Sequence, residues 1–149
     1  HDDGTTRPHV LIVEARFYDH IATMLLEGAT AVLEQVNATF EVVTVPGALE
    51  IPTAVVLGDA SDRYDAFVAL GCVIRGETSH YDIVAGESAR GLVALGMERG
   101  CPIGNGILTV DTEAQALVRA DPKAKNKGGD AARAALTLYG LAERYLVDE

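Results

Sequence analysis

The chain has 149 residues, of which 48% are hydrophobic, and its formal net charge is −10. The hydrophobic fraction excludes a disordered chain, and the acidic balance argues against a general nucleic-acid binder, which needs a basic face. No apolar run approaches the roughly 20 residues of a membrane span, and no secretory signal is evident. We therefore expect a flexible N-terminal segment over residues 1–9, one domain over residues 10–149, and a cytoplasmic protein without nucleic-acid or membrane partners.

Short apolar runs alternate with segments of helical periodicity. The expected strands are the apolar runs, and they span residues 10–13, 40–45, 66–70 and 103–110. The expected helices span residues 20–37, 48–59, 81–97, about 112–120 and 130–145. Asp19 and either Asp111 or Thr112 stand where a helix cap is favoured. This alternation of buried strands and helices predicts an α/β fold, a flavodoxin-like three-layer α/β/α sandwich around a four-stranded parallel sheet.

The segment from Gly71 to His80 joins the third expected strand to a helix. Its residues 75–79 are too polar to continue a buried strand. Ligands of open parallel sheets bind outside the carboxyl ends of the strands, and the N–H groups at a helix start favour an anion. His80 lies at this junction, and a histidine can transfer protons near neutral pH. The segment predicts a phosphate-sized anion beside a proton-transfer group; a helix-capping histidine on a polar surface is the alternative.

Three further segments are expected at the same edge of the sheet. They contain Arg16 and Phe17, the turn from Pro46 to Glu50, and Asn105. Phe17 either stacks on a planar ligand or covers a local core. The glycine of the turn either lets backbone groups approach a ligand or only joins a strand to a helix.

Two cations and two cysteines are the remaining candidates. Arg119 and Lys127 flank a cationic loop over residues 121–129, where solvated charge is the alternative to ligand binding. Cys72 and Cys101 lie in apolar surroundings, which indicates buried free thiols rather than a disulfide framework or a metal site. The sequence has no P-loop, no dinucleotide-binding fingerprint and no serine-hydrolase motif.

Five segments taken together resemble the lumazine synthase family, in the same order and spacing. They are Arg16-Phe17, residues 45–52 (VPGALEIP), residues 70–82 (LGCVIRGETSHYD), residues 106–109 (GILT) and residues 126–128 (NKG). The resemblance covers nearly the whole chain from about Val10. It implies a transferase that condenses 5-amino-6-(D-ribitylamino)uracil with 3,4-dihydroxy-2-butanone 4-phosphate, releasing phosphate and water. The product, 6,7-dimethyl-8-ribityllumazine, is the penultimate intermediate of riboflavin biosynthesis, and no metal or cofactor is implied.

The resemblance also implies a role for each site residue. His80 would transfer protons and Phe17 would stack on the pyrimidine. The other contacts to the ribitylaminouracil would come from Ala48, Leu49, Glu50, Cys72, Val73, Ile74, Asn105 and Lys127. The butanone phosphate would be held by Arg119 and by the backbone amides of Glu77 and Thr78. The chain departs from the family where it has Glu77 in place of Ala, Asn105 in place of an aromatic, and Asp-Pro-Lys at residues 121–123 in place of Gly-Thr-Lys.

The implied partners are the two small-molecule substrates, further copies of the chain and riboflavin synthase. The family forms a pentamer, or an assembly of pentamers, with active sites between neighbouring subunits. Asn105, Arg119 and Lys127 would then come from the second chain. Two alternatives stay open at this point: a weakly active or non-catalytic lumazine- or flavin-binding assembly paralogue, and a generic flavodoxin-like phosphate-binding module. The presence of both His80 and Arg119 favours the enzyme over the second alternative.

Overall fold

The structure, a computed structural model, describes residues 7–146 of the chain. Its sheet is parallel with the strand order β2-β1-β3-β4, and the strands are β1 (His9–Ala15), β2 (Thr39–Val45), β3 (Ala66–Ile74) and β4 (Ile103–Val110). The helices are α1 (Asp19–Gln35), the 3₁₀ helix η1 (Ala48–Glu50), α2 (Ile51–Ala60), α3 (His80–Arg99), α4 (Glu113–Ala120) and α5 (Lys127–Tyr145). Among the described residues, no helix is both long enough and apolar enough to cross a bilayer.

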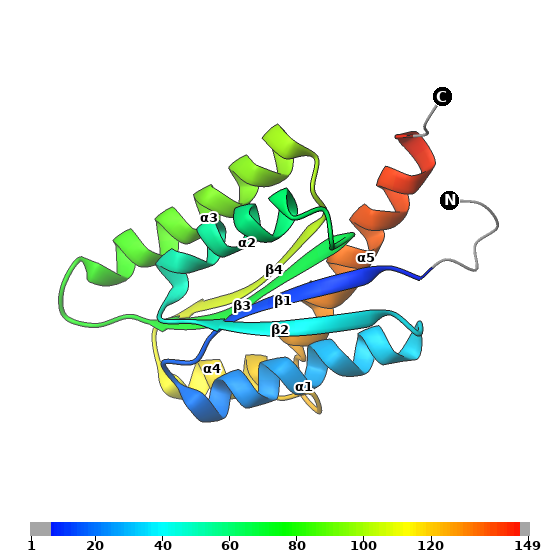
Figure 1. The fold of residues 1–149 in the computed structure, drawn as a ribbon. Coiled ribbons are helices and arrows are strands. Elements are labelled where there is room, and N and C mark those ends of the chain that lie inside the picture. The colour runs from blue at the N-terminus through cyan, green and yellow to red at the C-terminus, as the bar shows by residue number, and fades with distance from the viewer. Residues whose placement is uncertain (1–6, 147–149) are drawn as a thin grey trace.

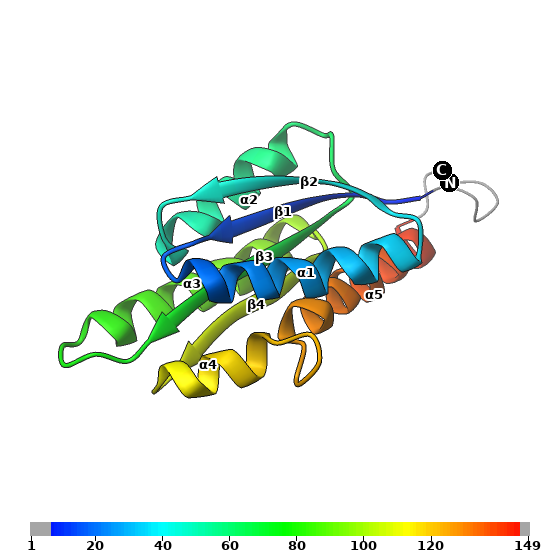
Figure 2. The same cartoon turned by 90° about the horizontal axis from the view of Figure 1, so that it is seen from below.

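Helices cover both faces of the sheet (Figure 1). α2 and α3 lie on one face, and α1, α4 and α5 lie on the other, where Figure 2 shows them side by side. A hydrophobic cluster fills each interface: Val13 packs with Ile51 on the α2–α3 side, and Val68 packs with Leu25 on the opposite side. The expected flavodoxin-like three-layer α/β/α sandwich is confirmed.

Several boundaries differ from the expected ones. β3 continues to Ile74, because the residues after Gly71 remain paired with β4. β1 begins at His9, one residue before the expected domain start, and residues 1–6 of the expected flexible segment lie outside the described residues. Tyr18, not Asp19, occupies the N-cap position of α1, and the Asp19 carboxylate instead accepts a hydrogen bond from Arg16 Nε at 2.7 Å.

β2 was expected to be buried, and this expectation is wrong for the described chain. β2 is an outer strand of the sheet, and most of its residues are exposed. Val42 and Val43 expose 41% and 39% of their surfaces. An apolar run gives the same sequence signal in an edge strand as in a central one, so the sequence did not separate them.

The start of α5 also differs from the expected structure. We expected Gly128 and Gly129 in a loop, but both lie buried in the first turn of α5. Asn126, in a left-handed conformation, caps the helix by accepting a hydrogen bond from the Gly129 N–H at 3.2 Å. A Cβ on Gly128 would lie 2.1 Å from the carbonyl oxygen of Leu25. Two backbones therefore meet here, and α5 can pack against α1 only where no side chain intervenes.

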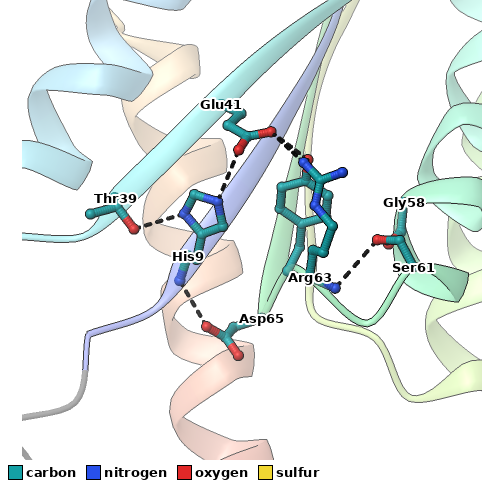
Figure 3. A network of polar contacts seen from close by, with 8 residues as sticks. His9, Thr39, Glu41, Gly58, Ser61, Arg63 and Asp65 are labelled. Carbon is teal, nitrogen blue, oxygen red and sulfur yellow. Dashed lines mark hydrogen bonds and ion pairs between the residues drawn. The ribbon is translucent and has the colours of Figure 1, made fainter.

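A polar network closes the amino-terminal edge of the sheet (Figure 3). The His9 N–H donates to Asp65 Oδ2 at 2.8 Å, and the His9 ring lies 5.2 Å from the Tyr64 ring in a stacked arrangement. Arg63 forms an ion pair with Glu41 at 3.0 Å. The hydrogen bond that Tyr64 donates to Glu41 holds the pKa of that carboxyl below its usual value. These contacts tie β1, β2 and the α2–β3 loop together at the edge opposite the carboxyl ends.

Two Gly→Ala variants in α5 test the close contact with α1. Gly128→Ala should lower the free energy of unfolding by about 1–3 kcal/mol or more, because the added methyl overlaps the backbone of α1. Gly140→Ala is the matched control, because Gly140 is exposed and a Cβ there meets nothing within 4 Å. It should raise the free energy of unfolding by about 0.5–1 kcal/mol through helix propensity. Urea unfolding measures both, and equal effects would contradict the packing described here.

Candidate active site

A cavity of about 360 Å³ opens at the carboxyl ends of β1 and β3. The parallel pairing of these strands places Glu14 opposite Leu70, so the loops that follow them leave the sheet at one edge. The cavity is lined by Ala15, Phe17, Tyr18, Pro46, Gly47, Ala48, Leu49, Glu50, Cys72, Val73, Ile74, His80 and Val84. The structure therefore brings together residues from four separate stretches of the sequence.

Phe17 offers an open aromatic surface at this cavity. Its side chain is 78% exposed. The ring packs edge-on against Tyr18, with 4.9 Å between the ring centroids and an angle of 84° between the planes. The face of the Phe17 ring is therefore available for stacking on a planar ligand, and Phe17 does not cover a local core in this chain.

Residues 46–50 form a second wall of the cavity. The Glu50 N–H donates to the Gly47 carbonyl at 3.1 Å, which closes the turn that begins η1. Ala48 is buried, whereas Leu49 and Glu50 are exposed. The turn thus places the apolar side chains of Pro46, Ala48 and Leu49, the Glu50 carboxylate and the backbone of Gly47 at the cavity.

The end of β3 supplies an apolar wall. Val73 is buried, and Cys72 and Ile74 are half-buried. Burial, with a smaller contribution from the Glu113 carboxylate, raises the pKa of the Cys72 thiol to about 11. Cys72 is therefore a neutral thiol near pH 7 and contributes packing surface rather than a nucleophile. Cys72 and Cys101 are both free thiols, and Cys101 is the one that is buried.

His80 is the first residue of α3 and has an exposed side chain at the cavity. Its backbone N–H donates to Thr78 Oγ1 at 3.2 Å. Ser79, not His80, occupies the N-cap position, so the expected alternative of a capping histidine does not describe this residue. Within residues 7–146 its imidazole makes no hydrogen bond or ion pair, so it is available to a bound ligand.

Glu77 and Thr78 lie in the exposed loop before α3 and do not line the cavity. Within the described residues, their backbone N–H groups donate no hydrogen bond to another part of the chain. Arg75, in the same loop, bonds Asp111 at 2.9 Å and lies 4.3 Å from the centre of the Tyr81 ring. The loop is therefore tied to the start of the β4–α4 connection, while two amides next to α3 stay open to an anion.

A second cleft, of about 420 Å³, runs along the outer strand β4 beside α4 and α5. Asn105, Arg119 and Lys127 line it, and none of its lining residues belongs to the first cavity. We expected Asn105 at the carboxyl edge with Phe17, and this expectation is wrong. Asn105 is paired with Ala69 inside β4, and its side-chain oxygen accepts a hydrogen bond from the Ile107 N–H at 2.9 Å.

The cations of the second cleft differ in their partners. Lys127 Nζ lies 3.6 Å from Asp130 Oδ2. Arg119 is half-buried and donates from Nη1 to the carbonyl of Gln115 at 3.1 Å. Of the carboxylates in residues 7–146, none forms an ion pair with Arg119. The cleft therefore presents a guanidinium with no carboxylate partner among residues 7–146, which suits an anion.

Sequence reasoning missed three residues of the first cavity, Ala15, Tyr18 and Val84. Val84 lies one helical turn after His80, so helical spacing alone could have placed it on the same face. Tyr18 directly follows Phe17, but nothing in the sequence indicated that Tyr18, like Phe17, lies at the cavity. In the described part of the chain, no group of three or more His, Cys, Asp or Glu side chains is arranged to hold a metal ion.

Comparisons with known proteins agree with this geometry. A family model described as 6,7-dimethyl-8-ribityllumazine synthase matches residues 7–143. The chain is 65% identical over 135 residues to the 6,7-dimethyl-8-ribityllumazine synthase of Novosphingobium aromaticivorans, a match that covers 91% of this chain and 96% of the relative. It is 60% identical over 134 residues to the enzyme of the same name from Zymomonas mobilis, covering 90% and 96% of the two chains. The chain belongs to the 6,7-dimethyl-8-ribityllumazine synthase family.

Proposed function

We propose that this chain condenses 5-amino-6-(D-ribitylamino)uracil with 3,4-dihydroxy-2-butanone 4-phosphate in the first cavity, completed by the second cleft of a neighbouring chain. The reaction yields 6,7-dimethyl-8-ribityllumazine, phosphate and water, the penultimate step of riboflavin biosynthesis. The observation that carries the proposal is that Phe17, residues 46–50 and His80, which lie far apart in the sequence, line one cavity. Relatives of 65% and 60% identity carry the enzyme's name, so the non-catalytic paralogue is not favoured.

The first cavity suits the ribitylaminouracil. The open face of Phe17 stacks on the pyrimidine ring, and Cys72, Val73 and Ile74 contact the ring edge. Ala48, Leu49 and Glu50 hold the polar ribityl chain through backbone groups and the carboxylate. A planar ring over an exposed aromatic, with few polar groups to set its orientation, is the usual composition of a small-molecule site.

The butanone phosphate is proposed to bind between two chains. The free amides of Glu77 and Thr78 face it from the start of α3, and Arg119 of the neighbouring chain pairs with its charge. Arginine can bind a phosphate through two parallel hydrogen bonds, which explains how a chain of net charge −10 holds an anion. Lys127 and Asn105 of that neighbour complete the wall over the pyrimidine.

His80 is the proposed proton-transfer residue. The amine of the pyrimidine attacks the ketone of the second substrate, and loss of water to form the imine and loss of phosphate both require proton transfers. A positioned histidine serves these steps near neutral pH. Holding the two substrates in contact supplies much of the remaining acceleration, worth roughly 7–11 kcal/mol for well-oriented reactants.

The proposal includes the quaternary structure and the setting. We propose a homopentamer, or an assembly of pentamers, in the cytoplasm, with riboflavin synthase, which consumes the product, as a further partner. Residues 10–149 are proposed to form one domain, which His9 joins as the first residue of β1. α3 supports self-association, because it exposes Ile83, Val93 and Met97 to solvent in the single chain.

Sedimentation velocity tests the assembly. At micromolar concentration the protein should sediment with a mass five times that of the chain, or a multiple of it. The reason is that the first cavity of one chain and the second cleft of another form a complete site only in an assembly. A stable monomer with full activity would contradict both the pentamer and the shared site.

The variant His80→Ala tests proton transfer. It should keep the fold and the assembly, because His80 is exposed, and lower kcat by roughly 10²–10⁴-fold. Lumazine absorbance, followed with both substrates saturating, measures the rate. His9→Asn is the control, since His9 lies at the opposite edge of the sheet and should leave kcat unchanged. If the kcat of His80→Ala equals that of the wild type at every pH, His80 has no role in the mechanism.

Replacement of Arg119 tests the phosphate site. Arg119→Ala should raise the KM for the butanone phosphate by roughly 10–150-fold, the value of a charge-assisted bond, and change the KM for the ribitylaminouracil far less. Arg119→Lys should restore only part of the loss, because lysine lacks the planar fork. Inorganic phosphate should inhibit the wild type competitively and inhibit Arg119→Ala much less.

Arg63→Ala removes an equal charge at the far edge of the sheet and should leave both KM values unchanged. The phosphate assignment fails if Arg119→Ala weakens the two substrates equally or leaves the KM for the butanone phosphate at its wild-type value.

A further inference from the structure

Glu14 is a buried carboxylate that the proposed chemistry does not use. It is only 3% exposed, near the carboxyl end of β1, and it does not line the first cavity. A buried charge is costly unless it is paired and hydrogen-bonded. Both oxygens of Glu14 have a partner: Arg16 Nη1 donates to Oε1 at 2.8 Å, and Thr44 Oγ1 donates to Oε2 at 2.8 Å.

The first partner leads to the loop that carries Phe17. Arg16 also donates from Nε to Asp19 Oδ1 at 2.7 Å and from Nη2 to the Asp19 carbonyl at 3.1 Å and to Thr23 Oγ1. The Arg16 guanidinium thus bridges the end of β1 and the first turn of α1. Phe17 lies in the chain between Arg16 and Asp19, the two residues that this bridge connects. Because the Phe17 ring makes few contacts of its own, its position depends on this bridged backbone.

The second partner leads to the turn at residues 46–50. Thr44 lies opposite Glu14 in the β1–β2 pairing and comes two residues before Pro46. The chain continues from Thr44 directly into the turn that carries Ala48, Leu49 and Glu50. One buried carboxylate therefore connects two of the segments that line the first cavity.

We infer that Glu14 is a positioning residue that holds the loop of Phe17 and the turn at residues 46–50 at a fixed separation, and thereby sets the fit of the ribitylaminouracil. The inference rests on the proposed function of the first cavity. It assigns Glu14 no contact with either substrate. Its effect reaches the ligand through Arg16 on one side and through Thr44 on the other.

An ordinary structural ion pair would act differently. A contact that only stabilises the end of β1 would, when weakened, lower the free energy of unfolding and leave the properties of the folded enzyme alone. A positioning contact changes the affinity of the folded enzyme for one substrate. The KM values of the two substrates, measured separately on folded protein, distinguish these roles.

Thr44 allows this test without disturbing the core, because its side chain lies on the exposed edge strand. Thr44→Val keeps the β-branched shape and removes only the hydroxyl donor, whereas Thr44→Ser keeps the donor. Thr44→Val should raise the KM for the ribitylaminouracil by about 2–10-fold, the range of one net hydrogen bond, and change the KM for the butanone phosphate less. Thr44→Ser should behave as the wild type.

A second variant acts on the carboxylate itself. Glu14→Gln keeps the shape but removes the charge that orients Arg16, so we expect a larger rise in the same KM, about 10–100-fold. Glu27→Gln, the same change at an exposed position of α1, is the control and should have no effect. Urea unfolding of each variant shows that the assays report on folded protein.

The outcomes separate this inference from the proposed function. If Thr44→Val and Thr44→Ser give the same KM for the ribitylaminouracil, or if Thr44→Val shifts both substrates equally, the positioning role of Glu14 is wrong and the enzyme assignment stands. If the wild-type protein forms no lumazine and binds no ribitylaminouracil, the proposed function is wrong, and the inference falls with it. A selective loss in Thr44→Val that serine restores supports the positioning role.

Discussion

The first cavity depends on the parallel pairing of β1 with β3. Val13 and Leu70 lie in this pairing and are buried between helices on both faces, so a shift of one residue would turn apolar side chains toward the wrong layer. With the register fixed, the loop after β1 and the end of β3 must open at one edge of the sheet. The chemistry proposed for Phe17 and for residues 72–74 follows from that alignment, and so does the position of α3, which brings His80 to the cavity.

The distribution of charge supports the proposed assembly of several chains. The group suited to proton transfer lies in the first cavity, and Arg119, which pairs with no carboxylate of residues 7–146, lies in the second cleft along the outer strand β4. On the proposed arrangement these groups meet only across an interface between two chains. On this proposal an acidic chain binds an anion through a local guanidinium.

Much of the fold was predictable from the sequence, because buried strands and amphipathic helices leave periodic apolar patterns. The exposure of β2 was not predictable, since an apolar run does not reveal which strand lies at the edge. Asn105 was misplaced because its position depends on the register of β4 against β3. Gly128 was assigned to a loop because its packing partner, the backbone of Leu25, lies about a hundred residues away in the sequence.

The candidate site was predictable only in part, because local sequence patterns do not show which distant segments meet in the folded chain. Phe17 and residues 46–50 follow strand ends, and His80 begins a helix, so local signals marked them. That Arg119 and Lys127 form a separate cleft depends on tertiary structure. Glu14 left a weak signal, a carboxylate directly after a buried apolar run and two residues before an arginine. Its partner Thr44 lies on another strand, which no local pattern could indicate.

Mixed assemblies test the shared site most directly. Chains carrying His80→Ala and chains carrying Arg119→Ala are denatured together, refolded as mixed oligomers and assayed at limiting butanone phosphate. Each parent oligomer has a defect in every site, but in a one-to-one mixture about a quarter of the interfaces pair an intact first cavity with an intact second cleft. The account predicts that mixing restores about that fraction of wild-type activity. Activity no higher than the average of the two parents, with mixed assembly confirmed by mass, would contradict a site built from two chains.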